Sequence, residues 1–206
     1  MLKRKCKITY ISHGATIHSE DFRVCSLENY PPLDEKGQEE IERVCEYLRK
    51  RGVKNDAIYS SPATRCIQTA RMISKVYKTD FEIVPEMTSR DWGDWSGLTL
   101  DKIVEKYSLK YDDDTPSIKA LTPENGEGIV EFNKRVDDLM NSIVEKNIGN
   151  RVIVITGPHV IQSVVANTLN VPPENQSRIL IKTGSLTQIS YFENWSSLIY
   201  SGLVPL

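Results

Sequence analysis

The sequence lacks the long hydrophobic run that a membrane-spanning helix requires. Such a helix needs about 20 consecutive apolar residues, and no apolar stretch among these 206 residues approaches that length. The basic start, residues 1–7, is not followed by an apolar block, so a secretory signal peptide is not expected either. These absences exclude a membrane protein and favour a cytoplasmic location.

Cysteine and histidine are both scarce. The four cysteines, Cys6, Cys25, Cys45 and Cys66, lie far apart and form no Cys-x-x-Cys pair, and only three histidines could join them in a metal site. The ligand spacings typical of structural zinc are therefore missing. We predict reduced thiols and no metal, and no motif implies an organic cofactor.

Neither sign of charge predominates. The chain has 26 Lys and Arg against 28 Asp and Glu, for a net charge of −2. Without a basic field, neither nucleic acid nor an anionic membrane surface is expected as a partner. The sequence leaves the oligomeric state open, a homodimer included.

What the sequence does contain is an alternation of short apolar strands and amphipathic helices. Apolar spacing predicts strands near 8–11, 57–59, 81–84, 152–155, 179–181 and 185–191, and helices over 35–51, 63–77, 100–107, 128–146 and 160–169. The stretches 17–34 and 108–126 are interpreted as surface loops. This alternation predicts an α/β protein, a three-layer α/β/α sandwich with a mostly parallel central sheet, in one domain over residues 1–206.

Two of the predicted strands are each followed by a small residue and a histidine. His13 follows the first strand, and His159 follows the strand at 152–155 through Thr156 and Gly157. In an open α/β sheet, ligands bind at the carboxyl ends of the strands, where helix N-termini also converge. We therefore expect both segments to contribute to one site.

Four segments, in order, carry a more specific pattern. They read Ser-His-Gly-Ala-Thr at 12–16, Ser-Ser-Pro-Ala-Thr-Arg-Cys-Ile-Gln-Thr-Ala at 60–70, Trp-Gly-Asp-Trp-Ser-Gly-Leu-Thr at 92–99 and Val-Ile-Thr-Gly-Pro-His-Val-Ile at 154–161. Together they resemble the histidine phosphatase superfamily, whose fold is phosphoglycerate mutase-like. The resemblance covers nearly the whole chain, and the block at 60–70 is its most specific part.

The resemblance implies a nucleophilic histidine that becomes phosphohistidine, which is kept here as His13, and a phosphate-binding arginine, kept as Arg65. It also implies an arginine just before the nucleophile, a glutamate that protonates the leaving oxygen and a second histidine after the late strand. Those three positions hold Ser12, Ser89 and Gly157, and His159 lies two residues beyond the last of them. Three of the five expected polar groups are missing.

Several neighbouring residues could replace the missing groups. Arg90, next to Ser89, could direct its guanidinium toward a phosphate. Glu86 or Asp91 could supply a carboxyl from a rearranged loop, and His159 could reach back toward the site. None of these substitutes follows directly from the spacing of the motif.

The missing groups set the expected function. A lost general acid costs about 10²–10⁴ in rate, and each lost oxyanion donor costs about 10²–10³. We expect a divergent phosphatase, rather than a mutase, with weak or altered phosphomonoester hydrolysis. His13 and His159 are its candidate catalytic residues, and the candidate ligands of a phosphorylated or other anionic small molecule are Arg65, Ser12, Ser89, Arg90 and Gly157. The alternatives are an inactive member that binds a phosphorylated ligand or a protein partner, and a pocket repurposed for different chemistry.

Overall fold

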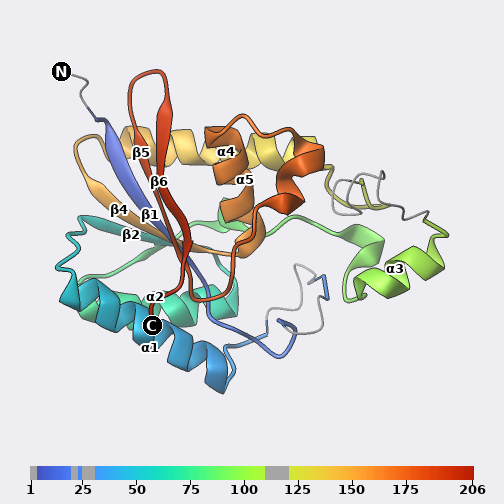
Figure 1. Cartoon of the computed structure of the whole chain (residues 1–206), viewed down its shortest axis with the longest axis horizontal. Helices are drawn as coiled ribbons and strands as arrows, with labels where there is room; N and C mark the ends of the chain where they lie inside the picture. Colours follow the sequence, from blue (N-terminus) through green and yellow to red (C-terminus); the bar gives the residue numbers. More distant parts are fainter. Residues whose placement is uncertain (1–3, 20–22, 25–30, 110–120) are drawn as a thin grey trace.

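A six-stranded sheet forms the centre of the computed structural model, which describes residues 4–19, 23–24, 31–109 and 121–206 (Figure 1). The strands are β1 (Cys6–Ser12), β2 (Ala57–Ser60), β3 (Glu82–Ile83), β4 (Arg151–Thr156), β5 (Leu186–Tyr191) and β6 (Ser196–Leu203), in the order β3-β2-β4-β1-β5-β6. The first four strands of this order pair in parallel. Strand β5 pairs antiparallel with β1 on one side and with β6 on the other. The predicted α/β sandwich with a mostly parallel sheet is confirmed.

Helices cover both faces of this sheet. They are α1 (Glu35–Lys50), α2 (Thr64–Tyr77), α3 (Leu100–Lys106), α4 (Ile129–Lys146) and α5 (Pro158–Thr168), and short 3-10 turns occupy Pro85–Met87, Gly93–Trp95 and Pro173–Arg178. Figure 1 shows α1 and α2 on one face and α4 and α5 on the other. In the part of the chain described, no helix combines the length and the apolar character needed to cross a membrane.

Side chains on the two faces of β1 pack into two separate parts of the core. Ile8 and Tyr10 pack with the side chains of α4 and α5, whereas Ile11 packs with those of α1 and α2. This division follows from the alternation of successive side chains across a strand. Because β1 is buried on both faces, the main chain at its carboxyl end is fixed, and so is the backbone of His13, which follows it.

The sequence prediction is wrong at one strand and misses another. Residues 179–181 do not pair with the sheet. The Ile179 carbonyl instead accepts a hydrogen bond from the Gln162 side chain of α5, at 2.7 Å. The alternation of this segment instead places Ile181 against the core, where it is 5% exposed, and leaves Leu180 on the surface, where it is 73% exposed. The missed strand, β6, is a half-exposed edge strand with no clear apolar alternation. The acidic run at 112–114 and Cys25 lie outside the described residues.

The loop that follows β1 lies directly against the first turn of α1. A Cβ atom added at Gly14 would lie 2.2 Å from the carbonyl oxygen of Gly37, and one added at Gly37 would lie 2.1 Å from the carbonyl oxygen of Ala15. The Ala15 N–H also donates to the Glu40 carboxylate at 2.9 Å. Only glycine permits this approach of two backbones, and α1 thereby fixes the chain beside His13.

Candidate functional site

His13 and Arg65 meet at the carboxyl edge of the sheet. His13 follows β1, and Arg65 lies in the first turn of α2, which begins shortly after β2 ends. The two strands both pair in parallel with β4, so their carboxyl ends lie at the same edge. The Arg65 Nε–H donates to His13 Nε2 at 2.9 Å, and both side chains are buried, with 5% and 6% exposure.

The hydrogen bonds of His13 define its tautomer. Nδ1 lies 2.8 Å from the carbonyl oxygen of Gly14. A carbonyl only accepts, so Nδ1 carries the hydrogen, and Nε2 presents its lone pair to Arg65. The main chain is equally constrained, because the His13 N–H donates to the Thr156 carbonyl and the His13 carbonyl accepts from the Gly184 N–H. The ring is thus held as a neutral imidazole whose Nε2 carries the free lone pair.

Burial is the main cause of the low basicity of this imidazole. Desolvation, followed by the charge of Arg65, lowers the pKa of His13 to about 3, and His159 adds a smaller effect in the same direction. The hydrogen bond to Gly14 opposes this shift but does not cancel it. A pKa this low keeps the imidazole neutral near pH 7, which is the form that attacks as a nucleophile.

We expect this imidazole to make the fold less stable in mild acid. An unfolded histidine binds a proton near pH 6.5, whereas folded His13 stays neutral down to a pKa of about 3. Between these values the unfolded chain binds more protons, so the free energy of unfolding decreases as the pH falls, by about 2 kcal/mol between pH 7 and pH 5. Urea denaturation of the wild type and of His13→Gln at both pH values measures this contribution. An equal loss in the two proteins would contradict it.

Gly157 adjoins both Ser89 and the Nε2 atom of His13. A Cβ atom added at Gly157 would lie 3.9 Å from His13 Nε2 and 3.1 Å from Ser89 Oγ. Ser12 is fully buried, and its hydroxyl has no hydrogen-bond partner in the described part of the chain. Gly157 therefore lies next to both His13 and Ser89, and positions 12, 89 and 157 hold small residues where the family resemblance implies large polar ones.

His159 lies in the first turn of α5, which begins after Gly157. Its ring packs edge-on against buried Trp92, with the centroids 5.6 Å apart. It is close enough to His13 to lower the pKa of that imidazole. This contact fixes the orientation of the His159 ring.

The guanidinium of Arg90, which the sequence offers as a replacement phosphate ligand, contacts main-chain carbonyls and a tryptophan ring. Its Nε donates to the Glu127 carbonyl at 2.7 Å, its Nη2 donates to the Leu121 carbonyl at 2.6 Å, and its guanidinium carbon lies 4.7 Å from the Trp92 ring centroid. The side chain is 1% exposed. We therefore assign Arg90 to holding the 121–127 segment.

Glu86 and Asp91, the two carboxyl groups that could replace the missing glutamate, have surroundings of their own. Asp91 Oδ1 accepts a hydrogen bond from the Gly93 N–H at 2.9 Å, which stabilises the turn that follows. Glu86 is an exposed residue. Of the residues near position 89, Ser89 is the one that the structure places beside Gly157.

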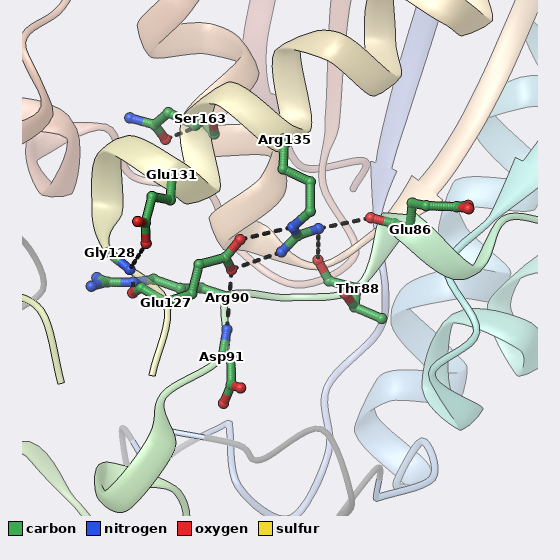
Figure 2. Close-up of polar contacts among 10 residues, drawn as sticks. Glu86, Thr88, Arg90, Asp91, Glu127, Gly128, Glu131, Arg135 and Ser163 are labelled. Atoms are coloured by element: carbon green, nitrogen blue, oxygen red, sulfur yellow. Dashed lines mark hydrogen bonds and ion pairs between the residues drawn. The ribbon is translucent and has the colours of Figure 1, made fainter. Parts of the chain in front are cut away.

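Sequence reasoning missed the ion pair between Glu127 and Arg135. The pair joins the loop before α4 to α4 itself and lies beside the 86–91 segment (Figure 2). A contact between a loop residue and a helix residue leaves no periodic pattern, so no sequence signal would have identified it. Cys6, Cys45 and Cys66 are buried free thiols, and the described residues contain no group of three or more His, Cys, Asp or Glu side chains suited to a metal.

Comparison with known proteins agrees with the family that the sequence motifs resemble. Residues 8–199 match the profile of the Histidine phosphatase superfamily (branch 1). The chain is 22% identical over 192 residues to the adenosylcobalamin/alpha-ribazole phosphatase of Escherichia coli K12, covering 93% of each protein.

Solved structures share the fold. YhfR of Bacillus stearothermophilus superposes with a TM-score of 0.86 at 23% identity, covering 97% of this chain and 98% of that one. A mycobacterial glucosyl-3-phosphoglycerate phosphatase in complex with VO3 superposes with a TM-score of 0.80 at 21% identity, covering 96% and 99%. At these identities the likeness establishes a common architecture.

Proposed function

We propose that this chain, which belongs to the histidine phosphatase superfamily (branch 1), hydrolyses phosphate monoesters through a phosphohistidine at His13. The observation that carries the proposal is the contact of a buried neutral imidazole, through Nε2, with a buried guanidinium. A nucleophile and an anion ligand within hydrogen-bond distance are the minimum that phosphoryl transfer to histidine requires.

The reaction follows from the donors and lone pairs present. A bound phosphoryl group takes the N–H donors of Arg65, which frees the lone pair on His13 Nε2. Nε2 attacks phosphorus, the bond between phosphorus and the ester oxygen breaks, and the leaving oxygen departs with the electron pair. The Gly14 carbonyl holds the Nδ1–H and stabilises the positive charge on the ring. Water then attacks phosphorus, the phosphorus–nitrogen bond breaks, and inorganic phosphate leaves.

The residues at positions 12, 89 and 157 support a particular substrate class. Ser89 occupies the position where the family resemblance implies a carboxylic acid, and a serine hydroxyl is a poor proton donor to an alkoxide. Gly157 and Ser12 supply no cation to compensate. The leaving group must therefore depart unprotonated, which favours aryl and acyl phosphates over alkyl phosphates.

Leaving-group dependence tests this function. We expect kcat/KM for 4-nitrophenyl phosphate to exceed that for glycerol phosphate by about 10²–10⁴, because a phenolate leaves without a proton and an alkoxide does not. Ser89→Glu is the matched control, since a carboxyl at position 89 should reduce this ratio. Comparable rates for both substrates would refute the substrate class, and no turnover of either would refute the function.

A second function, binding of a phosphorylated ligand without turnover, is favoured by the uncharged residues at positions 12, 89 and 157. In that case inorganic phosphate would raise the melting temperature of the wild type but not that of Arg65→Gln. The same preparation would release no phosphate from 4-nitrophenyl phosphate. The two measurements together separate this function from the first.

A further inference from the structure

Ser89 lies in a segment, residues 88–91, that has no helix or strand of its own. The segment is held from α4 by Arg135, as Figure 2 shows. Arg135 Nη1 donates to the carbonyl oxygens of Glu86 at 2.7 Å and Thr88 at 3.4 Å. One guanidinium thus fixes two carbonyls on the amino-terminal side of Ser89.

The same guanidinium is itself fixed by Glu127. Arg135 Nε and Nη2 each lie 2.8 Å from a different carboxylate oxygen of Glu127, in a bidentate pair. The two side chains are 29% and 16% exposed, so water screens this pair only partly. Bidentate geometry restrains the orientation of both groups as well as their separation.

Glu127 also reaches the carboxyl-terminal side of Ser89. Its Oε2 accepts a hydrogen bond from the Asp91 N–H at 3.3 Å, and its own N–H donates to the Asp91 carbonyl at 2.9 Å. Its carbonyl accepts from Arg90 Nε at 2.7 Å. Residues on both sides of Ser89 are therefore held by one ion pair, while Ser89 Oγ lies against Gly157, which itself adjoins His13 Nε2.

We propose that the Glu127–Arg135 pair is a positioning device that sets the Ser89 hydroxyl beside the phosphoryl group bound at His13 and Arg65. This inference rests on the proposed function. Ser89 Oγ then acts as a fixed hydrogen-bond donor to a phosphoryl or leaving oxygen. Donors held in place before the reaction stabilise developing charge most effectively, and a displacement of 1 Å costs about 10²-fold.

A double-mutant cycle separates positioning from a general structural role. We expect Ser89→Ala and Arg135→Gln each to lower kcat for 4-nitrophenyl phosphate by about 10- to 100-fold. The double variant should be no slower than the slower single variant, because Arg135 acts through Ser89. Multiplicative effects, or an unaffected Ser89→Ala, would overturn the proposal.

Two further variants control for charge and for stability. Arg135→Lys keeps the positive charge but cannot contact both carboxylate oxygens and both carbonyls, so its kcat should remain low even where its melting temperature recovers. Lys134→Gln removes the adjacent cation, whose 2.7 Å ion pair with Asp138 is exposed on the same helix. That variant should retain the wild-type kcat.

Vanadate affinity keeps the proposal testable if the wild type shows no turnover, which would refute the proposed function alone. The cycle is then read as the Kd for vanadate. We expect Ser89→Ala and Arg135→Gln to weaken binding by similar factors, with no further loss in the double variant. Independent losses would overturn the positioning role while leaving the anion site at His13 and Arg65 intact.

Discussion

His13→Ala is expected to reduce the turnover of 4-nitrophenyl phosphate to the background rate, a fall of about 10³-fold or more. The imidazole presents its Nε2 lone pair to Arg65, and loss of the proposed nucleophile would remove the covalent route entirely. Because burial holds its pKa near 3, this imidazole is already deprotonated at neutral pH. The loss should therefore be the same at pH 6 and pH 8.

His18→Ala serves as the matched control for this result. His18 lies five residues along the chain, is partly exposed and donates its backbone N–H to Thr16. Its replacement should leave kcat unchanged. An acid-labile phosphoenzyme, trapped by quenching the wild type during turnover, should be missing from His13→Ala. Retained turnover in His13→Ala would show that another residue attacks phosphorus.

The second large expected effect is an increase in activity toward alkyl phosphates. Ser12→Arg, Ser89→Glu and Gly157→His combined should raise kcat/KM for alkyl phosphates by about 10²–10⁴ or more, since they supply a proton donor and two phosphate ligands. The position at Gly157 accepts a side chain, because its φ of −85° and ψ of 160° are ordinary for any residue. A Cβ there would be tight against Ser89 Oγ at 3.1 Å, so positions 89 and 157 have to change together.

Folding and activity must be measured on the same triple variant. Ser12 is fully buried, and an arginine at that position has to extend into the anion site. Its melting temperature, with and without inorganic phosphate, reports whether the fold tolerates the new charges. A folded triple variant with no gain on glycerol phosphate would show that at least one of the three positions does not face the bound phosphoryl group.

The sequence predicts most of the fold because the signals involved are local. Apolar spacing identifies each helix to within two residues, and β1 and β4 are recognisable as short apolar runs that precede small residues. The strand predicted at 179–181 is wrong, because a short apolar alternation also fits a segment that covers the core: Ile181 is buried, and the Ile179 carbonyl accepts from the Gln162 side chain of α5. Edge strand β6 carries too little apolar alternation to be detected.

The residues of the candidate site also fall into those that the sequence predicts and those that it does not. His13 could be predicted because it follows the end of a strand, where ligands bind in open α/β sheets, and Arg65 because the block at 60–70 resembles the family motif. The orientation of Arg90 could not be predicted, because its partners are main-chain carbonyls of a loop 31 and 37 residues further along the chain. The pair of Glu127 and Arg135 is hidden for the same reason, since contacts between loop and helix depend on the assembled fold.

The backbone contact between Gly14 and Gly37 has a consequence for how firmly His13 is held. With no side chain between them, the main chain of the loop that follows β1 packs directly on the first turn of α1. A methyl group at either position would collide with a carbonyl oxygen of the other segment and force the two main chains apart. Two residues without side chains thus register the His13 ring against a helix that carries none of the site's polar groups.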